Sequence, residues 1–125
     1  MKITYEMLVE WRACEPRRDA FRAQFPDGAS VEAAGAWAQD SDLQWVVCHA
    51  SPAMREQASA ELLRRNTDDN CLSFIVCNAS PALREQASAE LLRRKADDSC
   101  LRYIVCCASP TLCEQARAEL DRRNS

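Results

Sequence analysis

A sixteen-residue segment occurs twice in this chain of 125 residues, with a single change. Residues 50–65 are ASPAMREQASAELLRR and residues 79–94 are ASPALREQASAELLRR, so only Met54 is replaced, by Leu83. A fixed step of 29 residues separates the two segments, and such a period predicts stacked supersecondary units. Three further sets of residues keep this step: Leu43, Leu72 and Leu101; Trp45, Phe74 and Tyr103; Pro52, Pro81 and Pro110.

The period divides the chain into a leader and three copies. Residues 1–41 do not share the repeat, and the copies are residues 42–70, 71–99 and 100–125, the last of them shorter. Repeat arrays need their ends covered, so we expect the leader to close one end of the stack. We identify no distinct polar cap at the other end, and we therefore expect a homodimer through the C-terminal repeat.

Each copy is predicted to form two helices. In the second copy Leu72, Ile75, Val76 and Ala79 are spaced i, i+3, i+4 and i+7, which is a helical stripe. A rival interpretation makes residues 73–77, SFIVC, a strand, and gives a strand–helix horseshoe similar to leucine-rich repeats. The two β-branched residues favour the strand, but the apolar spacing follows a period of 3.6 better than 2, so the helix pair is favoured.

The second helix of each copy starts at a serine–proline pair, which is a helix start signal. In the second copy this helix is predicted over residues 81–94. We expect its inner face to carry Leu83, Ala87 and Leu91 and its outer face to carry Arg84, Glu85 and Ser88. Phe74 and Cys77 add apolar bulk to the first helix, which we therefore expect to be covered from two directions.

The leader is predicted to form three helices, from Tyr5 to Cys14, over residues 16–25 and after Ser30. The predicted fold class is therefore all-α. It consists of a three-helix N-terminal segment followed by a short α-solenoid of helix-pair repeats with a 29-residue period.

The composition is ordinary for a globular protein. Hydrophobic residues make up 47% of the chain, and 16 basic against 19 acidic residues give a net charge of −3. This balance argues against direct nucleic-acid binding, which needs a basic face. The uncharged run of residues 71–83 is too short to span a bilayer, and the first residues lack the apolar stretch of a signal peptide. We expect a cytoplasmic protein without a membrane partner.

The eight cysteines follow the repeat more than any ligand spacing. Because one thiol recurs at the same place in each copy, we expect small buried side chains. Only Cys107 and Cys113 are unusual, and Cys113 replaces the arginine of the other copies, so we expect an exposed, oxidation-prone thiol there. The recurring thiols are Cys48, Cys77 and Cys106 in one position and Cys71 and Cys100 in another.

The sequence contains no recognisable catalytic or metal-binding motif. His49 is the only histidine, no C-x-x-C occurs, and the two glycines form no phosphate-binding loop. We expect no enzyme activity, no cofactor and no metal. A redox or metal protein using the cysteines stays open as an alternative.

Two segments resemble known families. Residues 3–31, ITYEMLVEWRACEPRRDAFRAQFPDGASV, resemble a leader that recurs on small proteins of phages and mobile elements. Residues 42–65, DLQWVVCHASPAMREQASAELLRR, are similar to HEAT-like α-solenoid units. The resemblance implies a phage-type accessory protein in the host cytoplasm, such as an anti-CRISPR inhibitor of a host-defence complex.

A partner-binding surface is predicted where the copies differ. A stacking surface must repeat because its neighbours repeat, whereas a surface that contacts an irregular partner is free to vary. The helical stack offers an extended face for a host protein or nucleoprotein complex, which it would block sterically. The varied residues on the first helices are Gln44, His49, Ser73, Asn78 and Arg102, with Arg102 as the expected anchor.

Paired aspartates also recur, close to paired arginines. We favour mutual pairing of these charges across the loops between helices. The alternative is an acidic ridge that imitates spaced phosphates and attracts a nucleic-acid-binding partner. The aspartates of this ridge are Asp68, Asp69, Asp97 and Asp98.

Overall fold

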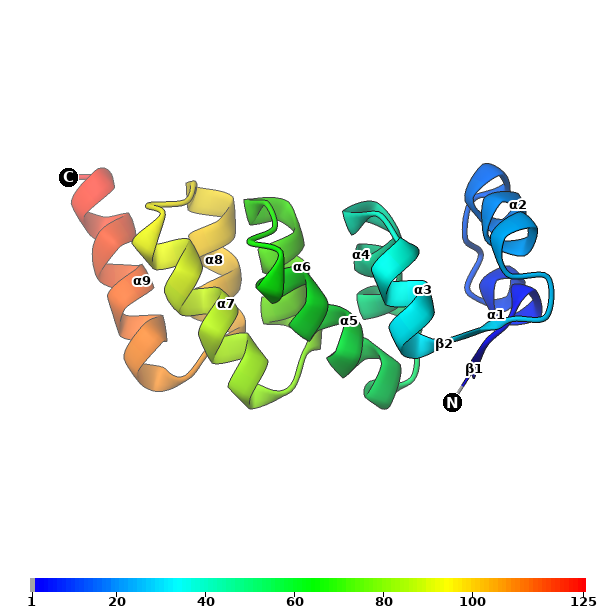
Figure 1. Ribbon diagram of the computed structural model, residues 1–125. Helices are drawn as coiled ribbons and strands as arrows, with labels where there is room; N and C mark the ends of the chain where they lie inside the picture. The colour runs from blue at the N-terminus through cyan, green and yellow to red at the C-terminus, as the bar shows by residue number, and fades with distance from the viewer. Residues whose placement is uncertain (1) are drawn as a thin grey trace.

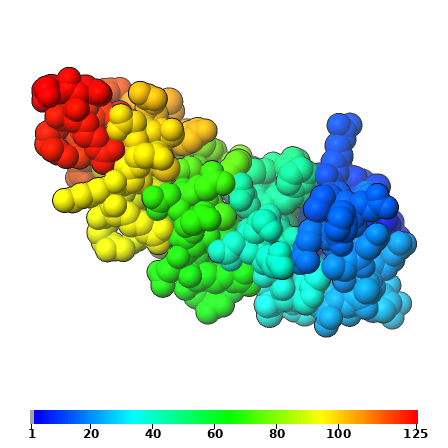
Figure 2. All heavy atoms as spheres, turned by 90° about the horizontal axis from the view of Figure 1, so that it is seen from above, coloured from blue at the N-terminus to red at the C-terminus, as the bar shows by residue number. Residues whose placement is uncertain are grey.

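The chain folds into an elongated stack of helix pairs, with the leader at one end and the last helix at the other (Figures 1 and 2). The computed structural model describes residues 2–125; this range is 75% helical, holds nine helices and has two very short strands. The predicted all-α repeat fold is confirmed. Residues 73–77 lie inside a helix, so the strand–helix alternative is wrong.

Neighbouring helices form three repeats after the leader. Repeat 1 consists of α4 and α5, repeat 2 of α6 and α7, and repeat 3 of α8 and α9, and each pair packs on the next. The helices are α1 (Tyr5–Glu10), α2 (Glu15–Gln24), α3 (Val31–Trp37), α4 (Asp40–His49), α5 (Pro52–Arg64), α6 (Asp69–Asn78), α7 (Pro81–Arg93), α8 (Asp98–Cys107) and α9 (Pro110–Arg123).

Local sequence signals start the helices of each repeat. The Asp68 carboxylate accepts a hydrogen bond from the backbone N–H of Cys71 at 2.8 Å and caps α6, as Asp97 caps α8. Proline at the first position starts each second helix, as predicted. The Ser80 hydroxyl does not cap α7 but donates to Glu56 of repeat 1 at 2.5 Å, and thereby links two repeats.

The repeats share one continuous hydrophobic core. Ile75, Leu91, Leu101 and Ile104 are completely buried in it. Ser88 is also completely buried, and its hydroxyl has no hydrogen-bond partner within residues 2–125, so the expected outward position of Ser88 is wrong. The reason is that repeat 3 covers this side of α7, which a single helix pair would leave exposed.

Two other residues assigned to the outer face of α7 also take part in stacking. The half-buried Arg84 donates to the carbonyl oxygens of Cys107 at 3.1 Å and Ala79 at 3.0 Å. Glu85 accepts from the backbone N–H of Ser109 at 3.5 Å. These side chains hold repeat 2 against repeat 3 instead of facing water.

The outer end of repeat 3 is polar, contrary to the sequence interpretation. Arg117 and Asp121 are exposed there, at positions where repeat 2 has the buried Ser88 and the half-buried Leu92. Charged side chains thus replace the residues that stack in the inner repeats. The homodimer through this end stays a prediction.

The leader contains the three predicted helices and a feature that was not predicted. Strands β1 (Lys2–Ile3) and β2 (Ala29–Ser30) pair antiparallel. Gly28 has a φ of +86°, and a Cβ there would lie 3.0 Å from the Ile3 carbonyl oxygen, so this turn requires glycine. Helix α1 ends at Glu10 rather than Cys14, because Arg12 takes a left-handed conformation that reverses the chain.

No helix within residues 2–125 has the length and apolar character that crossing a bilayer requires.

Candidate functional site

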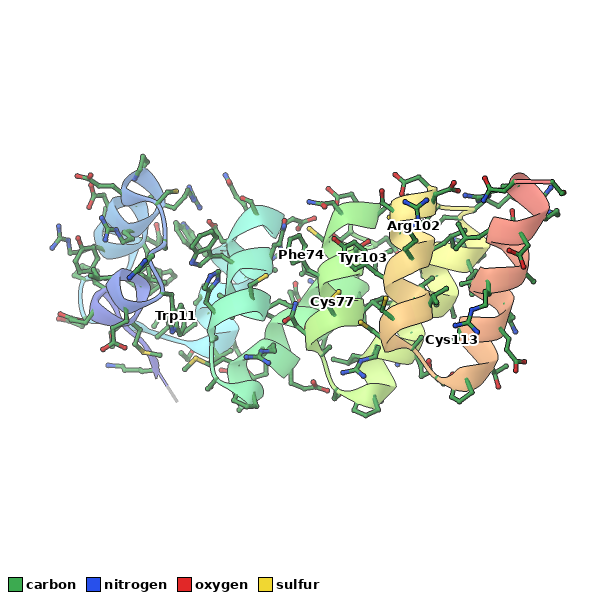
Figure 3. The ribbon with its side chains drawn as sticks, turned by 180° about the vertical axis from the view of Figure 1, so that it is seen from behind. Trp11, Phe74, Cys77, Arg102, Tyr103 and Cys113 are labelled. Carbon is green, nitrogen blue, oxygen red and sulfur yellow. The ribbon has the colours of Figure 1, made fainter. Side chains whose placement is uncertain are left out.

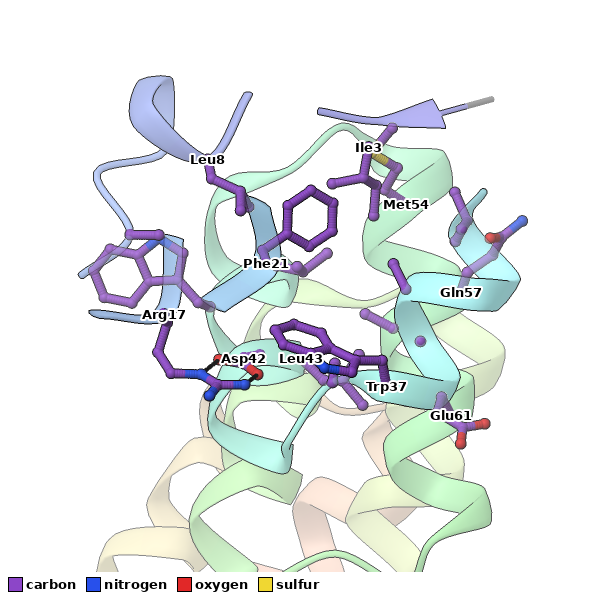
Figure 4. A pocket seen from close by; sticks show the side chains of 18 of the residues that line it. Ile3, Leu8, Arg17, Phe21, Trp37, Asp42, Leu43, Met54, Gln57 and Glu61 are labelled. Atoms are coloured by element: carbon purple, nitrogen blue, oxygen red, sulfur yellow. Dashed lines mark hydrogen bonds and ion pairs between the residues drawn. The ribbon is translucent and has the colours of Figure 1, made fainter. Parts of the chain in front are cut away.

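A cleft with a volume of about 660 Å³ lies between the leader and repeat 1 (Figure 4). This volume is within the range of small-molecule binding sites, which are mostly apolar. The leader contributes Leu8, Phe21 and Trp37 to its walls, and repeat 1 contributes Leu43 and Met54. Phe21 and Met54 belong to a small leader core that is separate from the core of the repeats.

An ion pair closes one edge of the cleft. Arg17 of α2 donates from Nε to Asp42 Oδ1 at 3.0 Å and from its terminal nitrogen to Oδ2 at 2.7 Å (Figure 4). The hydrogen bonds to Asp42 raise the pKa of Arg17. The guanidinium also lies over the Trp37 ring, 4.8 Å from its centroid. This contact holds the leader against α4 through one well-defined bridge.

Arg65 makes a second bridge, between α3 and repeat 1. Its guanidinium donates to the carbonyl oxygens of Gly35 at 2.6 Å and Ala38 at 2.9 Å, and pairs with Asp40 and Glu61. A hydrogen bond from Arg64, followed by the bond from Arg65, lowers the pKa of Glu61 to about 2. The carboxylate that lines this side of the cleft is therefore neutralised by two cations.

Two other arginines line the cleft without such partners. The side chains of Arg12 and Arg18 make no hydrogen bond or ion pair with any residue in the range 2–125, and the Nε atom of Arg18 is buried. Glu32, at the start of α3, also lines the cleft without an ion pair in this range. The unpaired charge at the cleft is thus two guanidinium groups against one carboxylate.

A second candidate surface is the face formed by the first helices α4, α6 and α8, which we call the first-helix face (Figure 3). Trp45 and Tyr103 are 38% and 47% exposed at equivalent positions on this face, and Phe74 is half-buried between them. The indole N–H of Trp45 donates to the Trp11 carbonyl oxygen at 2.7 Å, and His49 stacks on the Trp45 ring at 4.3 Å. Helix α6 packs on α7 and on the neighbouring first helices α4 and α8, but the side that carries Phe74 and Cys77, which was expected to be covered, leaves Phe74 half-buried and Cys77 exposed.

The five varied residues do not form one exposed ridge. Ser73 is only 5% exposed and its hydroxyl contacts Cys100 of repeat 3 at 3.2 Å, while Gln44 accepts from the Cys71 thiol at 3.5 Å. This position therefore faces the next repeat, where Gln44 and Ser73 both meet the recurring cysteine, so its variation is not explained by a partner that varies. Arg102 is exposed at the same position, on the last repeat.

The other two varied residues lie nearer the solvent. His49 is exposed, and its Nδ1 lies 3.0 Å from the Trp45 carbonyl oxygen. Asn78 is half-buried and donates to the Phe74 carbonyl oxygen at 2.9 Å. His49 and Asn78 are the last residues of α4 and α6, respectively, and each contacts the backbone of the aromatic residue four positions earlier.

The paired aspartates are occupied by local contacts. Asp68 and Asp97 cap helices, and hydrogen bonds from Cys100 lower the pKa of Asp97. Asp69 pairs with Arg94 at 3.1 Å and Asp98 pairs with Arg123 at 2.9 Å. The favoured interpretation, mutual pairing across the loops, matches these contacts.

All eight cysteines are free thiols, and their exposure differs from the prediction. Cys71 and Cys100 are buried as expected, and burial raises the pKa of Cys71 to about 11. The other recurring position was wrongly placed in the core, because it lies beside the aromatic residues on the open side of the first helices. Cys14, Cys77 and Cys106 are exposed, and Cys48 is intermediate.

Cys113 is half-buried rather than exposed. Its thiol donates to the Val105 carbonyl oxygen at 2.7 Å and lies 3.8 Å from the Ala108 carbonyl oxygen. Arg84 of repeat 2 donates to the equivalent Ala79 carbonyl, so the thiol partly takes over the role of the arginine. Within residues 2–125 no three His, Cys, Asp or Glu side chains form a group that could hold a metal ion.

Comparison of the chain with protein-family models, with curated proteins and with solved structures found no match.

Sequence patterns did not predict the cleft. It lies where a unique leader meets the first repeat, so no periodic signal marks it. The available signal was the number of large apolar residues in the leader, including Leu8, Phe25 and Trp37, which three short helices cannot bury among themselves. Trp45, Phe74 and Tyr103 recur with the 29-residue period, but the side of the helix that carries Phe74 was expected to be covered.

Proposed function

We propose that this chain is a non-enzymatic helical repeat protein that binds another protein through the first-helix face. The observation that carries the proposal is the exposure of Trp45 and Tyr103 at the same position of their repeats. Aromatic side chains are enriched in protein interfaces and contribute much of the binding energy. The face continues across three packed repeats, so it offers a partner one extended surface.

Arg102 supports this assignment. It is exposed next to Tyr103 on α8, and its side chain forms no ion pair with any residue in the range 2–125. Arginine and tyrosine together are typical of residues that dominate an interface. Among the five varied residues, Arg102, His49 and Asn78 can contribute to this face, whereas Ser73 acts between repeats.

The biological role proposed for this contact is steric inhibition of a host-defence complex, as the resemblance to phage accessory proteins implies. Phosphate mimicry is the weaker candidate, because arginines or helix N-termini neutralise Asp68, Asp69, Asp97 and Asp98. Expression in a bacterium that carries a defence system tests this role. Protection of a targeted plasmid supports it, and unchanged plasmid loss contradicts it.

Capture of a partner from host lysate, followed by a binding assay with that partner, tests the face itself. The double variant Arg102→Ala with Tyr103→Ala should keep the helical spectrum and bind at least tenfold more weakly, about 1.4 kcal/mol. The matched control is Arg64→Ala with Arg93→Ala, which removes two residues on the second helices whose side chains are 72% exposed. Loss of binding in the control but not in the test variant would place the interface on the second helices.

A further inference from the structure

The cleft between the leader and repeat 1 has the features of a ligand site. Its volume of about 660 Å³ exceeds the small voids that ordinary packing leaves, and apolar side chains form most of its walls. Repeats 1, 2 and 3 share a core with many completely buried side chains, and the cleft between repeats 2 and 3, beside Leu92 and Leu101, is smaller, at about 350 Å³. The first-helix face does not account for this cleft.

The charges of the cleft indicate what kind of ligand fits. Arg17 is neutralised by Asp42, and Arg64 is paired with Glu61, so neither is free to bind an anion. Arg12 and Arg18 remain, against Glu32 alone. A guanidinium group recognises a carboxylate through paired, charge-assisted hydrogen bonds, and these strengthen where water is partly excluded.

We infer that the cleft binds a small amphipathic monocarboxylate, with its apolar body among Phe21, Trp37 and Met54 and its carboxylate at Arg18. The apolar walls supply binding energy through burial of the ligand body. The Arg18 guanidinium, which lines the cleft and makes no hydrogen bond or ion pair within residues 2–125, then gains an acceptor. This site shares Trp45 with the proposed protein-binding face, and it lies at the other end of repeat 1 from repeat 2.

Decanoate is a suitable probe, with decanol and decyltrimethylammonium as controls of equal chain length. Calorimetric titration of the full chain should show decanoate binding at least tenfold more tightly than either control. Equal binding of decanol would show that no anion is recognised, and preferred binding of decyltrimethylammonium would show the opposite charge preference. Either result overturns the inference, as does the absence of decanoate binding at millimolar concentrations.

The variant Arg18→Gln separates the carboxylate site from the apolar walls. It should weaken decanoate binding at least tenfold and leave decanol binding unchanged. The matched control is Arg22→Gln on the same helix, because Arg22 does not line the cleft and lies over the Tyr5 ring. Equal decanoate affinity in wild type and Arg18→Gln, with both variants folded by circular dichroism, overturns the assignment of Arg18.

Two further measurements locate the ligand. Amide and indole NMR signals of Trp37 should shift on decanoate addition, and shifts confined to repeats 2 and 3 overturn the inference. Gly35 lines the cleft and a Cβ there would meet no atom within 4 Å, so the Cβ of Gly35→Leu fits without displacing a neighbour. This variant should weaken decanoate and decanol alike, and unchanged binding of both in this variant and in Arg18→Gln places the ligand outside the cleft.

Discussion

The contact between repeats 1, 2 and 3 and the contact between the leader and repeat 1 are built differently. Between repeats, the same small or apolar residues recur on each side, Ala87, Leu91 and Leu101 are completely buried, and the cleft between repeats 2 and 3 is only about 350 Å³. Between the leader and repeat 1, a few bridges such as Arg17–Asp42 surround a cleft of about 660 Å³. Repetition makes each interface a copy of the last, whereas the unique leader had to fit repeat 1 separately.

The largest expected effect compares one leucine from each contact. Leu91 is completely buried between helices, so Leu91→Ala should lower the free energy of unfolding by about 3 kcal/mol through lost burial and a new cavity. Leu8 lines the cleft and is only half-buried, so Leu8→Ala should cost about 1 kcal/mol. Chemical denaturation followed by circular dichroism measures both. Equal losses would mean that the cleft is as well packed as the repeats.

The 29-residue period was sufficient to predict the stacking of helix pairs, the serine–proline helix starts and the arginine–aspartate pairs. It could not show which side of each helix the neighbouring repeat covers. Ser88 and Cys77 were therefore placed on the wrong sides, since Ser88 is completely buried and Cys77 is exposed. For the first-helix face, the sequence indicated Arg102 and His49 but not the exposed aromatic residues.

The leader gave weaker signals because nothing in it recurs. The left-handed Arg12 and the short strand pair depend on contacts between residues distant in sequence, such as Ile3 with Ala29. The cleft depends on how this segment docks on repeat 1. Neither the strand pair nor the docking of the leader on repeat 1 has a pattern that can be recognised in one sequence.

A second prediction compares two neighbouring arginines at the end of α5. Arg65 bridges the leader and repeat 1, so Arg65→Gln leaves the Gly35 and Ala38 carbonyl oxygens without a donor and should cost about 1–2 kcal/mol. Arg64 is 72% exposed and pairs only with Glu61, so Arg64→Gln should leave the unfolding midpoint nearly unchanged. Thermal and urea unfolding provide the measurement. If the two variants lose stability equally, Arg65 is not a bridge.

A third prediction uses thiol accessibility to compare the same two regions. Cys100 lies buried between repeats 2 and 3, whereas Cys14 is exposed in the leader. Alkylation of the native protein, followed by mass spectrometry, should label Cys14 at least tenfold faster than Cys100, because Cys100 requires local opening. Cys77 should react slowly although its side chain is exposed, because partial desolvation and the neighbouring Cys107 raise the pKa of Cys77 to about 11. Rapid labelling of Cys100 would show that the repeats separate readily.

A fourth prediction concerns acid. Hydrogen bonds from Arg64 and Arg122 lower the pKa values of Glu61 and Glu119, respectively, to about 2, below the value near 4.3 expected in the unfolded chain. The stability from these pairs is therefore fully present above about pH 5 and is lost as the pH falls towards 2. Because the pairs are solvent-exposed at one side, the effect should be modest. Glu61→Gln with Glu119→Gln should flatten the acid slope of the unfolding midpoint, and an unchanged slope would assign it to other carboxylates.

The smallest expected effect tests the unpaired hydroxyl inside the repeat contact. Ser88 is completely buried and its Oγ has no hydrogen-bond partner within residues 2–125, so it carries a desolvation cost that no contact offsets. Ser88→Ala removes this cost and improves helix propensity, so it should stabilise the protein by about 0.5–1 kcal/mol. The matched control is Ala89→Ser at the exposed neighbouring position, which should cost a few tenths of a kcal/mol through propensity alone. A clear loss of stability in Ser88→Ala would mean that the hydroxyl is hydrogen-bonded to water between the repeats, which would make the repeat contact less dry than the geometry indicates.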